Sequence, residues 1–286
     1  MILSRVRDTV ATSEEGCAPS GTEIVPGYEV VSLMRHGRRL DTYDAYSKER
    51  DCRCVLKVVR EDRAHESACR EALVREGTLL RDLTHPHLVR AYEVVEEPRT
   101  AIVLETLSGA TLAALIEDAQ LTPADAAMMG LQLVSALSYL HRRGWLHLDV
   151  KPSNIVVQGG RAILIDLSLV GRPGDGRAGA GTDGYLSPEQ AHGQGLSSAS
   201  DVFGLGVTLG EALTGRLPYA EEGDWDRGTA PRRPGWRFRR HLGRAPKGFA
   251  ALVLACIDPD PARRPGLDDV RSVLRSLMAP DGEDGA

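Results

Sequence analysis

The sequence predicts an α+β fold with two lobes: a small β-rich lobe with one helix, then a larger, mainly helical lobe. Before Gly109, short apolar or alternating runs dominate, as is typical of β-strands. After Gly109, apolar residues recur at the spacing of helices. With 286 residues and 42% hydrophobic content, the chain can bury a core large enough for one domain of two lobes.

The small lobe is expected at residues 27–106. A single helix is predicted over residues 66–83, with leucines on one side and charged residues on the other. Residues 1–26 are mixed in charge and lack periodicity, so they are expected to form a flexible extension. Strands are predicted where apolar residues alternate or cluster, at residues 28–33, 42–46, 54–59, 88–94 and 101–104.

The larger lobe is expected at residues 109–278, so that one domain spans residues 27–278. Its first helix starts after Thr122, a cap residue followed by Pro123 and the acidic Asp125 in the first turn, and runs to about residue 143. The acidic tail, residues 279–286, is expected to be flexible. Further helices are predicted at residues 200–213, 248–257 and 267–277.

Composition argues against several classes of function. The net charge of -5 argues against nonspecific nucleic-acid binding. Five cysteines without a repeated spacing do not predict a disulfide framework, and Cys52 and Cys54 are read as ordinary thiols because a second ligand pair is missing. The sequence has no apolar run long enough for a membrane span and no apolar signal-peptide core, so a cytoplasmic protein is expected.

One basic stretch departs from this balance. From Arg227 to Lys247 the chain has many arginines and no acidic residue, with Trp236 and Phe238 among them. Such a stretch docks an acidic partner or forms a solvated face, and the second outcome is the commoner one.

The most informative chemical motif is HLDVKPSN, residues 147–154. It places Asp149, Lys151 and Asn154 at offsets of zero, two and five, and Asp166 follows Asn154 by twelve residues, after an apolar strand. Phosphoryl transfer needs an orienting carboxylate, a cation near the phosphate and oxygen ligands for magnesium. These four residues supply those parts, so the motif predicts a phosphoryl-transfer site.

The motif resembles the catalytic loop of protein kinases. From about residue 28 to 278 the chain is similar to the eukaryotic-like (Hanks-type) serine/threonine protein kinases of bacteria, with HLD for the family's HRD and DLS, residues 166–168, for its DFG. The resemblance implies the bilobal protein-kinase fold and ATP as phosphate donor. It also implies Mg²⁺, or Mn²⁺, as the metal and serine or threonine hydroxyls of proteins as substrates.

The resemblance assigns a role to each residue of the motif. Asp149 would orient the substrate hydroxyl and accept its proton, and Lys151 would steady the transferring phosphoryl group. Asn154 and Asp166 would bind magnesium.

The small lobe carries two further residues that match the protein-kinase family. Lys57, in a predicted strand, matches the family's phosphate-anchoring lysine, and Glu76 on the following helix matches the glutamate that pairs with it. Strand alternation puts Val55 on the same face as Lys57, where it would line an adenine pocket.

The glycine-rich loop of the family is degenerate in this chain. Counting back from Thr42, its three glycine positions fall on Arg35, Gly37 and Leu40, so only Gly37 remains. Because a side chain costs about 1 kcal/mol or more where φ must be positive, we expect weaker phosphate contact, or an ordinary charged hairpin. By resemblance, the nucleotide would be contacted by Gly37, Thr42, Val55, Lys57, Val156 and the backbone of Glu105 and Leu107.

A later segment separates this chain from small-molecule kinases. Thr182 and the SPE tripeptide that ends at Glu189 resemble the end of a protein-kinase activation segment, and Arg264 matches the arginine that pairs with that glutamate. Asp201 matches the aspartate that braces the catalytic loop. A partly buried carboxylate needs such a partner, and small-molecule kinases have no reason for the pair.

Leu148 bears on regulation. It replaces an arginine that commonly grips a phosphorylated activation-loop residue in the family, and residues 167–180 contain no threonine. We therefore expect activity without activation-loop phosphorylation. The alternative is a pseudokinase, a nucleotide-binding regulatory module with weak or no transfer, for which the degenerate glycine-rich loop is the main support.

Overall fold

The structure, a computed structural model, describes residues 17–219 and 234–278. The described chain divides into two compact units. The first contains the residues up to Asp82 together with Arg90–Thr106, and the second contains Leu83–Val89 and the residues from Leu107 onward. One unit is mainly a sheet and the other mainly helices, so the predicted α+β fold class is confirmed.

The first unit is built on a six-stranded antiparallel sheet with strand order β1-β2-β3-β4-β6-β5. Alternate residues of β3 are buried, because one face of the strand packs against the core. Tyr43 and Leu56 are the largest fully buried side chains of that core. The strands are β1 (Glu23–Val25), β2 (Tyr28–His36), β3 (Leu40–Ser47), β4 (Cys52–Val59), β5 (Ala91–Val95) and β6 (Ala101–Glu105).

The helix of the first unit, α1 (Ser67–Asp82), follows a short 3-10 turn at Glu61–Arg63 and packs against β5 and β6. Its buried face includes Leu73, Leu80 and Gly77. A Cβ at Gly77 would lie 2.5 Å from Val94 Cγ2 and 2.8 Å from Ile102 Cγ1. The missing side chain therefore sets how closely the helix approaches the sheet.

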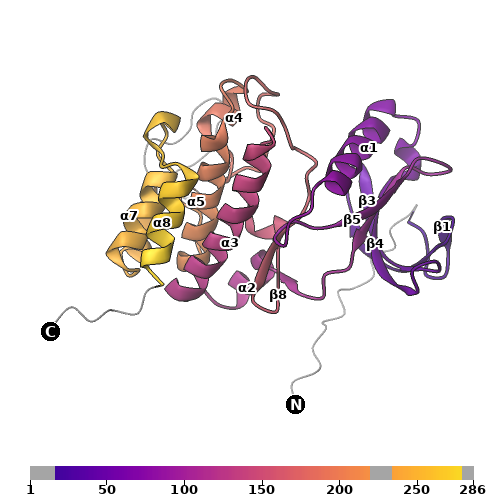
Figure 1. The fold of residues 1–286 in the computed structure, drawn as a ribbon, viewed down its shortest axis with the longest axis horizontal. Coiled ribbons are helices and arrows are strands. Elements are labelled where there is room, and N and C mark those ends of the chain that lie inside the picture. Colours follow the sequence, from indigo (N-terminus) through magenta and orange to yellow (C-terminus); the bar gives the residue numbers. More distant parts are fainter. Residues whose placement is uncertain (1–16, 220–233, 279–286) are drawn as a thin grey trace, which may run out of the picture. The chain divides into compact units, whose positions relative to one another are not determined.

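The second unit surrounds α5 (Ser198–Thr214), which is buried along most of its length and contacts α3, α6 and α7 (Figure 1). Gly215, in the left-handed conformation, ends α5. The other helices are α2 (Leu112–Asp118), α3 (Pro123–Arg142), α4 (Pro188–His192), α6 (Trp236–Leu242), α7 (Lys247–Cys256) and α8 (Leu267–Ser276), with 3-10 turns at Pro152–Asn154 and Pro261–Arg263.

A small sheet completes the second unit, with strands β7 (Ala110–Thr111), β8 (Ile155–Gln158) and β9 (Arg161–Leu164) in that order. Thr122 caps α3 as its sequence predicts, since its side chain accepts a hydrogen bond from the Asp125 amide. The predicted helices at 200–213, 248–257 and 267–277 correspond to α5, α7 and α8.

Two expectations are corrected. The predicted flexible extension, residues 1–26, is wrong for its last ten residues, because β1 pairs with β2 and Val25 is fully buried; residues 1–16 lie outside the described residues. The strand predicted at 88–94 begins only at Ala91, because Leu88 and Val89 pair with Leu164 of the second unit instead. Residues 83–89 therefore belong to the helical unit and not to the small lobe.

Part of the basic stretch and the whole acidic tail lie outside the described residues. The described part of that stretch, residues 234–247, contains α6, where Trp236 is exposed and Phe238 is buried. Within residues 17–219 and 234–278, no helix is both long and apolar enough to cross a membrane.

The close approach of α1 gives a first prediction. Alanine favours a helix over glycine by about 1 kcal/mol, yet a Cβ at residue 77 would overpack the core, which typically costs about 1–3 kcal/mol. We expect Gly77→Ala to lower the free energy of unfolding in a urea titration. Gly248→Ala in α7 is the control, because its Cβ would find its nearest neighbour at 3.7 Å, an ordinary contact. A Gly77→Ala variant as stable as Gly248→Ala would contradict this account of the packing.

Candidate active site

The HLDVKPSN motif forms a loop between α3 and β8 in the second unit. Leu146, just before the loop, exchanges two backbone hydrogen bonds with Gly171, at 2.8 and 3.0 Å. Within the loop, Leu148 has a φ of 63°, in the left-handed region. This conformation costs a residue other than glycine about 1–2 kcal/mol, so the loop needs support from elsewhere.

Asp201, in the first turn of α5, supplies that support. Its buried carboxylate accepts hydrogen bonds from the amides of His147, at 2.9 Å, and Leu148, at 2.7 Å. His141 Nε2 lies 2.7 Å from the same carboxylate and donates a third bond. Burial lowers the pKa of the fully enclosed His147, so that ring is neutral at physiological pH. His141 is a site residue that sequence reasoning missed, since no motif marks it.

The Asp149 side chain is held from three directions. Asn154 Nδ2 donates to Asp149 Oδ2 at 2.9 Å and to its backbone oxygen at 3.0 Å. Lys151 Nζ donates to Oδ2 at 2.6 Å, and Thr182 Oγ1 donates to Oδ1 at 2.8 Å. Lys151 also contacts Thr182 Oγ1. The structure thus brings four of the predicted residues into one hydrogen-bonded cluster.

Asp166 follows β9 at the start of the DLS tripeptide. Its φ of 66° is left-handed, and its Oδ1 accepts a bond from the Ser168 amide at 3.1 Å. The Ile165 amide donates to the Asn154 backbone oxygen at 2.8 Å, which ties the segments carrying the two proposed magnesium ligands.

The segment after DLS is bound to the region around α4 by a ladder of backbone hydrogen bonds. Gly174 and Leu196 exchange two bonds, at 2.9 and 2.7 Å. Gly176 donates to the Gly193 oxygen at 2.9 Å, and Gly179 donates to the Gln190 oxygen at 3.0 Å. The ladder holds residues 174–179 in place with neutral groups.

Gln190 adds a side-chain tie that sequence reasoning also missed. Its Nε2 donates to the backbone oxygens of Leu148, at 2.8 Å, and Ala180, at 3.3 Å. Its Oε1 accepts from Ser187, the cap residue of α4. A serine followed three residues later by glutamine is the sequence signature of such a capping box, so the position could have been identified.

Glu189 and Arg264 form a buried, two-pronged ion pair with distances of 2.6 and 2.9 Å. Ser200 Oγ donates to the same carboxylate at 2.8 Å. The arginine also donates to three backbone oxygens, those of Ala199, Asp258 and Pro259. Burial acts to raise the pKa of Glu189, but the hydrogen bonds and charge of Arg264 outweigh it and hold that pKa below its usual range.

In the first unit, Lys57 on β4 and Glu76 on α1 form a second ion pair. Lys57 Nζ lies 2.8 Å from one carboxylate oxygen of Glu76 and 2.9 Å from the other. Both side chains are largely buried, with 12% and 3% of their surface exposed. Thr42 is the cross-strand neighbour of Lys57 on β3, and Val55 lies two residues away on the same strand.

Gly37 lies in the tight hairpin between β2 and β3. Its amide donates to the Leu40 oxygen at 3.0 Å, and a Cβ at this position would lie 2.3 Å from that oxygen. The glycine is therefore required by the closeness of the hairpin backbone.

The remaining proposed nucleotide contacts are distributed over both units. Glu105 ends β6, where it pairs with Cys54 of β4, and its amide is bonded to the Arg90 oxygen. Leu107 begins the main segment of the second unit, and Val156 is buried in β8.

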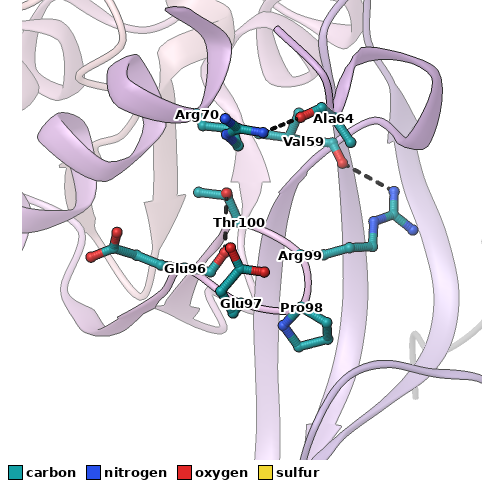
Figure 2. Close-up of a pocket in the computed structure, with 8 residues that line it drawn as sticks. All are labelled: Val59, Ala64, Arg70, Glu96, Glu97, Pro98, Arg99 and Thr100. Carbon is teal, nitrogen blue, oxygen red and sulfur yellow. Dashed lines mark hydrogen bonds between the residues drawn. The ribbon is translucent and has the colours of Figure 1, made fainter. Parts of the chain in front are cut away.

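A separate pocket of about 130 Å³ lies in the first unit, beside the turn that joins β5 to β6 (Figure 2). Three hydrogen bonds join its lining residues: Arg70 donates to the Ala64 oxygen, Arg99 to the Val59 oxygen and Thr100 to the Glu96 oxygen. None of its lining residues belongs to the predicted site. The lining residues are Val59, Ala64, Arg70, Glu96, Glu97, Pro98, Arg99 and Thr100.

Comparison with known proteins gives a consistent match. Residues 28–274 match the family described as the protein kinase domain. The serine/threonine-protein kinase PkaA of Streptomyces coelicolor is 32% identical over 237 residues, which cover 77% of this chain and 42% of that protein. The serine/threonine-protein kinase PrkC of Bacillus subtilis is 30% identical over 210 residues, covering 71% and 32%. The serine/threonine-protein kinase PknB of Mycobacterium tuberculosis is 31% identical over 206 residues, covering 67% and 33%. The chain thus spans less than half the length of these relatives.

The buried ion pair gives a second prediction. Arg264→Met leaves the Glu189 carboxylate buried without a cation, which costs about 3–5 kcal/mol of unfolding free energy. We expect Glu189→Gln to cost less, because Arg264 keeps its three backbone acceptors. Arg263→Met is the matched control. The Arg263 side chain is 74% exposed, so its replacement changes the free energy of unfolding by about 0.5 kcal/mol or less. Chemical unfolding at neutral pH measures all three.

The same pair has a pH dependence. Because the pKa of Glu189 is lowered in the folded protein, its contribution to stability is complete above the unfolded value of about 4.3 and is lost as the pH falls through the folded pKa. In Arg264→Met, burial raises the pKa of Glu189, so the carboxyl is protonated at a higher pH in the variant than in wild type. The stability gap between the two proteins therefore narrows as the pH falls from above about 4.3. A gap that stays constant down to the acid limit of folding would show that Arg264 does not act through this carboxylate.

Proposed function

Because this chain belongs to the protein kinase domain family, we propose that it transfers the γ-phosphate of ATP to serine or threonine hydroxyls of proteins. The observation that carries this proposal is the cluster of Asp149, Lys151, Asn154 and Thr182. It places a carboxylate, a cation and a hydroxyl within hydrogen-bond distance of one another.

Asp149 acts in this proposal as the group that receives the substrate hydroxyl. Its hydrogen bonds to Asn154 and Thr182 fix the orientation of the carboxylate, and its side chain remains 8% exposed. Lys151 is the cation beside it and is assigned to the transferring phosphoryl group. Thr182, which donates to Asp149, is proposed to lie beside the substrate hydroxyl and to contact it.

The donor set suits magnesium. Mg²⁺ prefers oxygen ligands, and Asp166 offers a carboxylate while Asn154 offers an amide oxygen. Because Asn154 Nδ2 is committed to Asp149, the amide orientation is fixed and its oxygen is the atom left for a ligand. The ion would neutralise charge on the phosphates of ATP and align them for transfer.

For the nucleotide, we assign Lys57 to the phosphates and Glu76 to holding that lysine in position. The two distances below 3 Å between them support this assignment. Thr42, Val55 and Val156 are proposed to contact the nucleotide through their side chains, and Gly37, Glu105 and Leu107 through backbone. All five cysteines are thiols, which suits a reducing compartment such as the cytoplasm.

We also propose that the activation segment does not need phosphorylation. A phosphate-gripping arginine is replaced by Leu148, and the segment is already held by the backbone ladder and by Gln190. The Glu189 and Arg264 pair anchors its far end. In this proposal, uncharged hydrogen bonds from the backbone ladder and Gln190 order the activation segment, where other kinases use a phosphate.

A pseudokinase is the second candidate, favoured by the Gly37 hairpin, which has one glycine where the family has three. The decisive experiment uses the full chain with Mg²⁺ and labelled ATP, and scores phosphorylation of the protein itself and of a basic protein substrate. We expect transfer by wild type and a loss of about 10²–10⁴-fold in Asp149→Asn, which keeps the shape of the side chain but removes the carboxylate. Asp268→Asn is the control, since that exposed carboxylate lies on α8.

Nucleotide binding without transfer by wild type would instead establish the pseudokinase. Transfer that survives fully in Asp149→Asn would show that another group receives the hydroxyl proton.

The regulatory proposal has its own test. We expect phosphatase-treated wild type and Ser168→Ala to keep the activity of untreated protein. Gln190→Glu keeps the oxygen that caps α4 but loses the donor to Leu148 and Ala180. Two neutral hydrogen bonds are worth about 1 kcal/mol each, so we expect kcat/KM to fall about tenfold or more. Gln194→Glu, on an exposed side chain nearby, is the control. Activity abolished by the phosphatase would contradict phosphate-independent order.

A further inference from the structure

Three side chains of the first unit gather where the β2–β3 hairpin closes. Cys17 precedes β1, His36 ends β2 and Asp41 is the second residue of β3. Cys17 Sγ lies 3.1 Å from His36 Nδ1, and Asp41 Oδ1 lies 2.8 Å from the same nitrogen. The sulfur, nitrogen and oxygen atoms all lie within 4.8 Å of one another. Within residues 17–219 and 234–278, this is the group of His, Cys and acidic side chains close enough to share a metal ion.

Asp41 is the unexplained member of this group. Only 1% of its surface is exposed, its Oδ1 makes no hydrogen bond, and the polar atom that lies beside this oxygen is His36 Nδ1, at 2.8 Å. Its other oxygen has one long contact, 3.4 Å from the Tyr43 hydroxyl. A buried carboxylate with so few hydrogen bonds costs free energy, and a bound cation would offset that cost.

The chemistry of the three donors selects the ion. A cysteine sulfur, an imidazole nitrogen and one carboxylate oxygen are ligands that Zn²⁺ takes readily, whereas Mg²⁺ and Ca²⁺ prefer oxygen alone. Cysteine and aspartate together carry two negative charges when bound, which balance the dication. We propose that Cys17, His36 and Asp41 bind Zn²⁺, with water as the fourth ligand.

The positive charge of Arg60, beside His36, disfavours binding of a cation at this site. Its Nη1 contacts His36 Nε2 and also donates to the Gly37 oxygen at 3.0 Å. A guanidinium can only donate, so in this arrangement the ring proton is on Nδ1, which faces Cys17 and Asp41. Zinc binding moves that proton to Nε2, and Arg60 then keeps the Gly37 oxygen as its acceptor. With three protein ligands and this competing cation, the zinc is exchangeable and not a permanent part of the fold.

The site would fix the segment before β1 to the hairpin that contains Gly37. Zinc then stabilises the first unit by binding only its folded form. This proposal does not depend on the kinase activity, because ion binding is measured directly.

The test uses the full chain stripped of metal with a chelator and then titrated with Co²⁺ as a spectroscopic substitute for Zn²⁺. We expect one Co²⁺ per chain, with a sulfur-to-cobalt charge-transfer band and the visible bands of a tetrahedral site, both removed by added Zn²⁺. Cys17→Ser abolishes the charge-transfer band. Asp41→Asn weakens zinc binding about 100-fold or more, because loss of a ligand costs at least as much affinity as loss of a residue that only hydrogen-bonds to a ligand, for which about 100-fold is the upper value. Arg60→Gln tightens binding, because it removes the competing cation.

Cys52→Ser is the matched control, since Cys52 is an exposed thiol on β4, and it leaves the cobalt spectrum unchanged. Circular dichroism verifies that each variant is folded; if Asp41→Asn does not fold, Cys17→Ser decides, because Cys17 lies ahead of the first strand. The proposal is overturned if wild type binds no stoichiometric ion, or if the charge-transfer band survives in Cys17→Ser.

Discussion

Asp201 supports the backbone on which the candidate active site depends. The left-handed conformation of Leu148 costs about 1–2 kcal/mol, whereas each hydrogen bond to a charged group contributes about 1.5–3 kcal/mol, so the two amide bonds to Asp201 more than offset the strain. The fixed loop then directs Asp149 toward Lys151, Asn154 and Thr182. A residue on α5 that touches no proposed ligand thereby determines the geometry of the reacting groups.

The two buried ion pairs fix positions more than they add stability. Desolvation offsets much of the attraction within such pairs. In the second unit, Glu189 and Arg264 anchor the end of the activation segment. In the first, Gly77 allows α1 to approach the sheet closely, and the adjacent Glu76 can then reach Lys57 on β4. The close packing at Gly77 and the ion pair of Glu76 thus together set the orientation of Lys57.

Much of this architecture could be predicted from the sequence. The Thr122 cap, the strand of Lys57 and the long apolar pattern of α5 each contain their signal within a few residues. The brief strand β1 could not be recognised, because three residues carry too little periodicity, and Leu88 and Val89 are as apolar as strand residues whichever sheet they join. The proximity of Cys17, His36 and Asp41 depends on hairpin register and on the path of the chain before β1. The chemical roles of the clustered residues stay predictions, whereas their contacts are structural facts.

The ladder between the activation segment and α4 has a consequence for salt. Arginine to phosphate contacts near a surface weaken as ions screen them, over a Debye length of about 8 Å at physiological ionic strength. Backbone hydrogen bonds such as those of Gly174 and Gly176 involve no net charge. The order of residues 174–179, which lead to Thr182, is therefore insensitive to ionic strength, which distinguishes a stretch ordered by its own peptide groups from one ordered by an added charge.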